Sequence, residues 1–126
     1  KEVLTANPNL KGIQGSAMPD VAGAALAVEE LGLAGKVQIV GTSLVSVSGK
    51  YIKNGTIAMA SFWDPALAGK AMIELALKVL NKEPVANGLN LNVPGYENLT
   101  LDGKVLSGQA WIDITKENVD DPSINF

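Results

Sequence analysis

The sequence predicts an α/β fold with a Rossmann-like parallel sheet and flanking helices, on the basis of two observations. Three apolar segments with the character of buried strands alternate along the chain with segments of helical periodicity. This alternation requires right-handed crossovers, which place the strands parallel to one another. Of the 126 residues, 47% are hydrophobic and 18% are charged, so the chain can bury one modest core.

The first strand–helix pair follows residues 1–8, which read as the last turns of a helix. The segment Leu10–Gln14 is predicted to be a short strand. After it, apolar residues recur at positions i, i+3, i+4 and i+7, the spacing of one helix face. This helix begins at Pro19–Asp20 and ends near Gly32 or Gly35, because glycine favours the backbone conformation that closes a helix.

Two further pairs complete the alternating part of the chain. The second strand is Lys36–Gly41, and a short helix follows at Ser46–Asn54. The third strand is Thr56–Phe62, and a longer helix follows at Asp64–Lys82. Asp64 is a good N-cap for that helix, which therefore begins directly after the strand.

The remainder of the chain has a different pattern, with short β segments and turns. Three segments have β character: Leu89–Val93, Leu99–Leu101 and Ala110–Thr115. Pro94–Gly95 and Asp102–Gly103 are typical turn dipeptides. We expect residues 117–126 to form a loose polar tail.

The composition excludes several classes of function. The chain has no Cys and no His, which removes thiol nucleophiles, imidazole bases and most zinc sites. Its ten basic residues are all Lys, scattered singly, and its net charge is −3, so nucleic acid is not an expected partner. No nucleotide-binding glycine fingerprint follows a strand, and no acidic pair is spaced for catalysis. We expect no enzyme activity, no cofactor and no metal site.

Position in the fold makes Trp63 the first candidate for ligand binding. It lies between the third strand and the helix that follows, at the carboxyl edge of the sheet, where open α/β sheets bind small molecules. A core or contact role is the alternative for Trp63. Asp64 is a second candidate, although capping the helix is the favoured role for it. Trp111 stands in the apolar segment with Ile112 and Ile114, and we interpret it as structural.

The turns after the first two strands supply the other candidates. Ser16, Ala17 and Met18 precede a helix N-terminus, where backbone N–H groups and a hydroxyl can bond ligand oxygens. Thr42 and Ser43 occupy the turn after the second strand. The alternative is that all of them are ordinary turn residues.

An ordered set of segments also resembles a known family. The segments are Asn7–Ile13, Asp20–Gly32, Val37–Gly41, Tyr51–Gly55, Phe62–Pro65 and Lys116–Val119. Together they resemble the C-terminal half of a type I periplasmic sugar-binding protein, and most of all the branch with the rhamnose-binding and autoinducer-2 receptors of ABC importers. In this family two lobes close on a sugar, and the chain crosses between the lobes three times.

The resemblance implies an incomplete two-lobe structure, as a piece of a longer protein. Residues 1–62 would be an α/β segment of the C-lobe, residues 63–88 a hinge crossover with a helix on the N-lobe, and residues 89–126 a β-rich return segment with a tail. The implied ligand is a monosaccharide or small polyol, such as a rhamnose-like sugar or an autoinducer-2-like signal. The implied partner is an ABC permease in the membrane. The protein would be monomeric and extracytoplasmic, in the periplasm or lipid-anchored at the cell surface.

The site residues match the family only in part. Trp63 aligns with a pocket residue. The autoinducer-2 receptors carry Pro and Ala where we align Ser16 and Met18, and pentose-binding relatives carry an Asp in the turn that here holds Thr42 and Ser43. Two alternatives remain at this stage: the effector-binding core of a lac-repressor-type transcription regulator, which shares the fold, and a small α/β enzyme.

Overall fold

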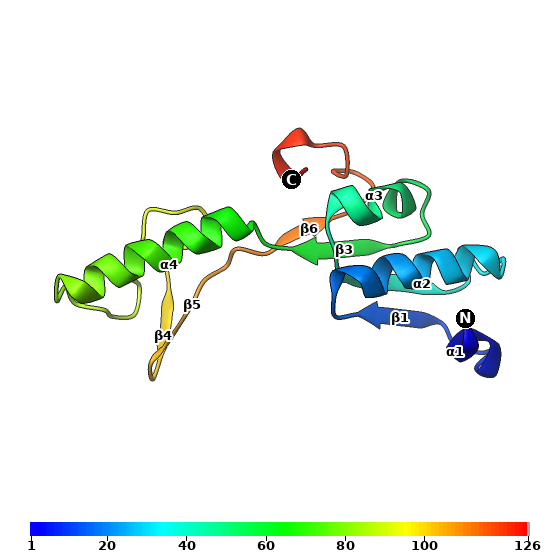
Figure 1. Cartoon of the computed structure of the whole chain (residues 1–126), viewed down its shortest axis with the longest axis horizontal. Coiled ribbons are helices and arrows are strands. Elements are labelled where there is room, and N and C mark those ends of the chain that lie inside the picture. Colours follow the sequence, from blue (N-terminus) through cyan, green and yellow to red (C-terminus); the bar gives the residue numbers. More distant parts are fainter. Residues whose placement is uncertain (126) are drawn as a thin grey trace. The chain divides into compact units, whose positions relative to one another are not determined.

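The computed structural model describes residues 1–125, which form two compact units (Figure 1). Unit 1 contains residues 1–62 together with the chain from Ile112 onward, and unit 2 is Trp63–Trp111. The chain therefore leaves unit 1 after the third strand and returns to it at the last strand. None of the helices in the described range is long and apolar enough to span a membrane.

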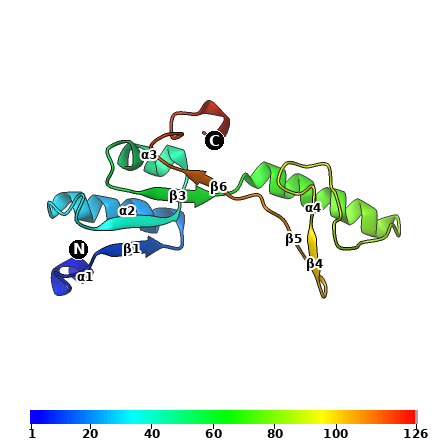
Figure 2. The same ribbon diagram turned by 180° about the vertical axis from the view of Figure 1, so that it is seen from behind.

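Unit 1 is built on a four-stranded sheet in the order β1-β2-β3-β6. The strands are β1 (Gly12–Gly15), β2 (Gln38–Thr42), β3 (Met59–Phe62) and β6 (Ile112–Ile114). The first three are parallel, as the alternating pattern predicts, whereas β6 is antiparallel to β3 because the chain re-enters the sheet from the opposite direction (Figure 2). The α/β class is confirmed, with a mixed rather than a purely parallel sheet.

Two helices of unit 1 pack against this sheet, α2 (Met18–Glu30) and α3 (Val45–Lys53). The unit also contains α1 (Glu2–Ala6) and a 3-10 helix at Pro122–Ile124. The packing of α2 and α3 against β1, β2 and β3 buries the strand residues that point toward them, including Ile39, Ala60 and Ile114. Strand residues on the other face are partly or fully exposed, as the alternation of side chains along a strand requires.

The ends of the unit 1 elements differ from the prediction in two places. Residues 56–58 are not part of β3, because Thr56 is held by the side chain of Asn54 and its hydroxyl donates to Glu29. The apolar run there reflects the burial of Ile57 in a turn, since Ile57 is only 1% exposed. The predicted loose tail is also wrong over residues 117–125, because Val119 is buried in the core of unit 1.

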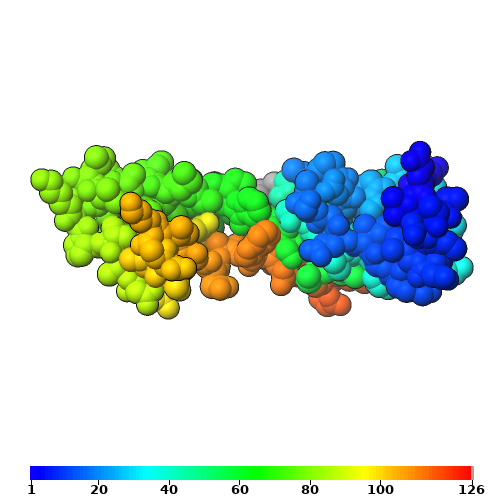
Figure 3. Space-filling model, turned by 90° about the horizontal axis from the view of Figure 1, so that it is seen from below, coloured from blue at the N-terminus to red at the C-terminus, as the bar shows by residue number. Residues whose placement is uncertain are grey.

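Unit 2 consists of the helix α4 (Pro65–Leu80) and a hairpin of β4 (Thr100–Asp102) and β5 (Val105–Ser107). Its core contains Ala71, Leu91, Val93 and Leu99. In the space-filling view, the orange atoms of the hairpin lie beside the yellow-green atoms of the same unit (Figure 3).

The β segments of unit 2 correct the prediction in two ways. Residues 89–93 form a single bridge, Leu89 to Leu99, and not a strand, because Asn92 adopts a left-handed backbone conformation with φ 54°. The strand β5 was not predicted. The Asp102–Gly103 dipeptide does form the predicted tight turn, between Asp102 and its partner Val105.

Candidate functional site

The carboxyl ends of the first strands of unit 1 bring the predicted turn residues to one edge. Gly15 pairs with Gly41, and just beyond this pair lie Ser16 and Ala17 with Met18, the first residue of α2, on one side and Thr42 and Ser43 on the other. Thr42 is the last residue of β2 and not a turn residue as predicted, whereas Ser43 does follow the strand. The two segments are in contact, because the Ser43 hydroxyl donates to the carbonyl oxygen of Met18 at 3.4 Å. The structure thus places these five candidates at the same edge.

Two glycines make this close approach possible. Gly41 has φ 150°, and a Cβ atom at this position would collide with the carbonyl oxygen of Gly15. A Cβ at Gly15 would in turn lie 2.7 Å from the side chain of Val21 on α2. The missing side chain of Gly41 therefore lets the ends of β1 and β2 approach each other, and that of Gly15 lets α2 pack against the end of β1.

The candidates at this edge are not equally accessible. Ser43 is 1% exposed, and its hydroxyl shares a 2.6 Å hydrogen bond with the hydroxyl of Ser48. Its side chain holds the turn together from inside. Ser16, Ala17 and Met18 are exposed, although the Asp20 carboxylate already accepts from the backbone N–H of Ala17 at 3.1 Å. The Ser16 hydroxyl donates to the same carboxylate at 3.4 Å, so Ser16 and Ala17 are exposed but already have a hydrogen-bond partner.

Sequence reasoning missed a polar pair beside Thr42. Register pairs Thr42 with Ser61 on β3, and Ser61 with Asp113 on β6, so the three side chains share one face of the sheet. The Ser61 hydroxyl donates to the Asp113 carboxylate at 2.6 Å. Asp113 is exposed and lies at the same end of the sheet as the two turns. Only the pairing of β6 with β3 reveals it, because the two residues are 52 positions apart.

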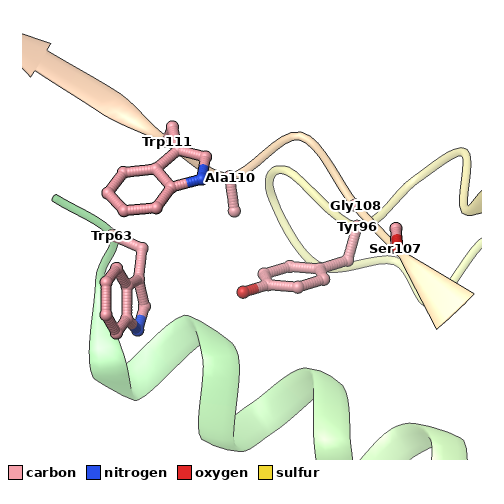
Figure 4. A pocket seen from close by; sticks show the side chains of 6 residues that line it. All are labelled: Trp63, Tyr96, Ser107, Gly108, Ala110 and Trp111. Carbon is pink, nitrogen blue, oxygen red and sulfur yellow. The ribbon is translucent and has the colours of Figure 1, made fainter. Parts of the chain in front are cut away.

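Unit 2 contains an open pocket of about 400 Å³ around Trp63. Its lining consists of Trp63, Tyr96, Ser107, Gly108, Ala110 and Trp111 (Figure 4). Trp63 is 44% exposed, so it is not a core residue. Its ring centroid lies 5.1 Å from that of Trp111, with the two ring planes at 80° in an edge-to-face contact.

We expected Trp111 to be a structural residue within the apolar segment Ala110–Thr115, and the structure places it outside the strand. The strand β6 begins one residue later, and Trp111 is 58% exposed. Its neighbour Ile112 starts the strand, whereas the indole of Trp111 contacts Trp63 in the lining of the pocket. The apolar run of the sequence did not distinguish the two residues.

Backbone geometry positions Tyr96 in the same pocket. Residues 93–96 form a tight turn in which the Tyr96 N–H donates to the Val93 carbonyl oxygen at 2.8 Å and Gly95 has φ 81°. Figure 4 shows the hydroxyl end of Tyr96 pointing toward the two indoles. Gly108 allows this packing, since a Cβ there would lie 3.1 Å from the Tyr96 ring.

Asp64, next to Trp63, acts as the cap of α4. Its Oδ1 accepts from the N–H groups of Ala66 at 2.7 Å and Leu67 at 3.4 Å. The favoured reading of this residue as a helix cap is confirmed. The carboxylate fixes the point at which the chain turns from Trp63 into the helix.

The chemistry of the pocket is that of a neutral site. Its lining has three aromatic rings, two hydroxyl groups and no carboxylate or amine. Within residues 1–125, no group of three or more His, Cys, Asp or Glu side chains is arranged to hold a metal ion. Aromatic faces combined with a few hydroxyls suit a small molecule that has apolar C–H faces and polar edges.

Residues 1–84 match the family described as periplasmic binding protein domain. Among solved structures, the chain is similar to an ABC transporter solute-binding protein from Agrobacterium vitis with bound D-fucose, at 26% identity and a TM-score of 0.70, covering 99% of this chain and 38% of that chain. A protein of the same class from Clostridium phytofermentas with bound L-rhamnose is 18% identical, with a TM-score of 0.73, covering 95% and 42%.

A third structure shares the fold. LsrB from Clostridium saccharobutylicum in complex with AI-2 is 19% identical, with a TM-score of 0.69, covering 95% of this chain and 42% of that chain. The chain thus spans about two fifths of the length of these three structures.

Proposed function

This chain belongs to the periplasmic binding protein domain family, and we propose that it is part of the substrate-binding component of an ABC importer that takes up a monosaccharide or small polyol. The type I binding-protein fold and the expected absence of enzyme activity follow from this membership and from the similar solute-binding proteins, and both predictions are confirmed. The family is extracytoplasmic, and we propose the periplasm or a lipid anchor at the cell surface for this chain.

The single observation that carries the proposal is the aromatic pocket at Trp63. A sugar presents C–H faces that stack on indole rings and hydroxyls that bond to Ser and Tyr side chains. The pocket supplies both kinds of surface in about 400 Å³, which lies within the range of small-molecule sites. The bound D-fucose of the 26% identical solute-binding protein supports a rhamnose-like sugar, and an autoinducer-2-like signal is the second ligand we propose.

We assign the parts of the chain to the lobes of a two-lobe receptor. Residues 1–62 would belong to the C-lobe, and residues 63–88 would form a crossover with a helix on the N-lobe. The expected return segment, residues 89–126, is divided, because residues 89–111 belong to the same unit as α4 and the chain returns to unit 1 at Ile112. Two observations support this assignment. The chain leaves unit 1 after Phe62 and re-enters it at Ile112. The helix α4 also exposes apolar side chains, with Met72 at 72% and Leu80 at 76%, as expected for a helix that the rest of an N-lobe would cover.

The ligand-binding role of the turn residues is the finer part of the proposal. Ser16, Ala17 and Met18 would meet the sugar through exposed groups at the start of α2. Thr42 would do so through its hydroxyl, whereas Ser43 would act by holding its turn, because its side chain is buried. The membrane partner would be the ABC permease, and the receptor would be monomeric.

Replacement of Trp63 in the complete receptor tests the proposal. Trp63→Ala removes a stacking surface, so we expect a ten- to hundredfold loss of sugar affinity, or about 1–3 kcal/mol. The melting temperature should change little, since Trp63 is 44% exposed. Isothermal calorimetry against a monosaccharide panel measures the affinity.

Val105→Ala is the matched control, because Val105 is also exposed in unit 2 but does not line the pocket. Its sugar affinity should equal that of the wild type. Unchanged affinity in a destabilised Trp63→Ala protein would show that Trp63 is structural and would overturn the proposal. The isolated 126-residue chain should bind the same sugars weakly, because it supplies only one side of a two-lobe site.

A further inference from the structure

Glycine follows an Asn or Asp residue at three exposed turns of the chain: Asn54–Gly55, Asn87–Gly88 and Asp102–Gly103. Such dipeptides are chemically labile, because glycine has no side chain to hinder attack by its backbone nitrogen on the preceding side chain. We propose that Asp102 is a site of spontaneous isomerisation to isoaspartate, whereas the fold protects Asn54 and Asn87 from the corresponding loss of ammonia. The inference is independent of sugar binding.

The reaction at Asp102 needs no oxidant, enzyme or cofactor. The backbone nitrogen of Gly103 attacks Cγ of the protonated Asp102 carboxyl group, and one molecule of water leaves as the N–Cγ bond closes a five-membered succinimide ring. Water then adds to one of the two ring carbonyl groups. Addition at Cγ restores aspartate, and addition at the former backbone carbonyl carbon gives isoaspartate of the same mass. At an Asn–Gly dipeptide the same attack expels ammonia instead of water.

Hydrogen bonds hold both reacting groups of the first dipeptide. The Gly55 N–H donates to the Ile52 carbonyl oxygen at 3.1 Å. The Asn54 side chain accepts from the Thr56 N–H at 3.0 Å and donates to the Glu29 carboxylate at 2.7 Å. The nitrogen of Gly55 therefore reaches Cγ of Asn54 only when the end of α3 opens locally.

The second dipeptide is held in the same way. The Gly88 N–H donates to the Leu99 carbonyl oxygen at 2.7 Å, and the Asn87 side-chain oxygen accepts from the Leu101 N–H at 2.9 Å. These bonds join residues 87 and 88 to the segment that leads into β4. Because Leu99 is 3% exposed in the core of unit 2, opening at this position disturbs that core.

Asp102 and Gly103 lack both restraints. They lie at the tip of the β4–β5 hairpin, which projects away from α4 (Figure 1). Asp102 pairs with Val105, which leaves the N–H of Gly103, the first residue of a two-residue turn, outside the ladder. Within residues 1–125, neither this N–H nor the Asp102 carboxylate hydrogen-bonds to another group of the chain.

The surroundings of the turn also leave space for the ring to close. Gly103 has φ 58°, and no atom lies within 4 Å of the position that a Cβ would occupy. Both strands of the hairpin are three residues long, and so short a hairpin opens readily. The folded structure therefore restrains Asp102 much less than it restrains Asn54 or Asn87.

Isomerisation would alter the hairpin itself. In isoaspartate the main chain runs through Cβ and Cγ, which adds one carbon atom before Gly103, and the former backbone carbonyl becomes a carboxylate. The pairing of Asp102 with Val105 is then lost. Hydrogen exchange at the Val105 N–H should accordingly be faster in the isomerised molecules than in the unmodified ones.

The experiment ages the complete receptor and maps its peptides by liquid chromatography with electron-transfer mass spectrometry. Mildly acidic buffer suits Asp102, since its carboxyl group must be protonated, and neutral buffer suits the two Asn residues. A sample in guanidinium chloride gives the rate of each dipeptide without the fold. We expect Asp102 to react within about threefold of its unfolded rate, and Asn54 and Asn87 to react at least about tenfold more slowly than theirs.

Variants test the mechanism at each site. Gly103→Ala should slow isoaspartate formation at Asp102 by at least about tenfold, because the added methyl group hinders the attacking nitrogen. Glu29→Ala removes a partner of Asn54 and should accelerate the loss of ammonia there about fivefold, whereas Asn87 is the matched control and should keep its rate. Melting temperatures establish that each variant is folded.

Three results would overturn the inference. The fold could slow Asp102 as much as it slows Asn54 and Asn87, or either Asn residue could react in the folded receptor at its unfolded rate. Gly103→Ala could also form isoaspartate at the wild-type rate. Equal acceleration of Asn54 and Asn87 in Glu29→Ala would contradict local protection by hydrogen bonds. None of these results depends on whether the receptor binds a sugar, so the proposed function is tested separately.

Discussion

Unit 1 buries fourteen apolar residues in one core between a sheet and its helices, whereas the core of unit 2 contains four buried residues beneath a single helix. In unit 1 the elements follow from periodic burial along each strand and helix. In unit 2 the shape between α4 and β6 depends on turns, on one hairpin and on glycines with positive φ at positions 88, 95 and 103. The two units therefore position their candidate binding residues differently. In unit 1 these residues follow the ends of strands, and in unit 2 they are placed by the geometry of turns.

The largest expected effect comes from the core of unit 1. Ile39 is 0% exposed at the centre of the sheet, so Ile39→Ala should lower the free energy of unfolding by about 4 kcal/mol. Leu99→Ala removes the equivalent volume from the core of unit 2, where partly buried neighbours can move inward, and should cost about 2 kcal/mol. Urea unfolding of the two variants measures the difference. Equal losses would contradict the contrast between the two cores.

The second prediction concerns the turn that carries Tyr96. Gly95→Ala places a Cβ 2.7 Å from Ala110 at a residue with φ 81°, so we expect a loss of about 2–3 kcal/mol and weaker sugar binding. Gly103→Ala is the matched control in the same unit. Gly103 has φ 58° with nothing within 4 Å of the added atom, so the cost should be about 1 kcal/mol, with sugar affinity unchanged.

Thermal unfolding and calorimetry read out this pair of variants. If the two substitutions destabilise equally, the close approach of residues 95 and 110 does not shape unit 2. If Gly95→Ala binds sugar as the wild type does, turn geometry does not position the pocket.

The smallest expected effect is a pH dependence. The Thr56 hydroxyl, at 2.8 Å, and the Asn54 amide, at 2.7 Å, hold the pKa of Glu29 below its ordinary value of 4.5. A lowered pKa in the folded state contributes stability that is present above pH 4.5 and is lost as the pH falls through the lowered pKa. Glu29→Gln should therefore flatten the decline in stability with acid, measured by urea unfolding below pH 5.

Glu83 in unit 2 provides the comparison. Its pKa is lowered first by the ammonium group of Lys78, at 3.0 Å, and then by the Asn81 amide. These contacts are local to the end of α4, whereas Glu29 links α2 to the chain just before β3. At high salt, Glu83→Gln should therefore flatten the decline in stability with acid less than Glu29→Gln does. The reason is that salt screens an exposed ion pair more than neutral hydrogen bonds. A larger effect at Glu83 would reverse this ranking.

Much of unit 1 could be predicted from the sequence because burial there is periodic. The end of α2 near Gly32 and the start of α4 at Asp64 depend on caps that a few residues specify. The start of β3 could not be predicted, since Thr56 and Ile57 are β-formers held in a turn by Glu29 and the Tyr51 carbonyl. A tertiary contact there overrides local propensity.

The candidate site shows the same division. The turn residues and Trp63 could be predicted because strand ends converge at one edge of a parallel sheet. The positions of Asp113 and Trp111 could not be predicted. Each contacts a residue about fifty positions earlier in the chain, so its place depends on how β6 pairs with β3. Trp111 and Ile112 are adjacent and both apolar, and only the start of β6 separates an exposed indole from a strand residue.

The edge-to-face contact of Trp63 with Trp111 has an optical consequence. The chain has two tryptophans, and both lie in this contact at the wall of the same pocket. Tryptophan fluorescence from this chain therefore comes only from this pocket, with no contribution from a tryptophan in either core. With ring centroids 5.1 Å apart, the two indole transitions are also close enough to couple in circular dichroism. A molecule that separates or reorients the rings would change both signals, so the pocket contains its own spectroscopic probe.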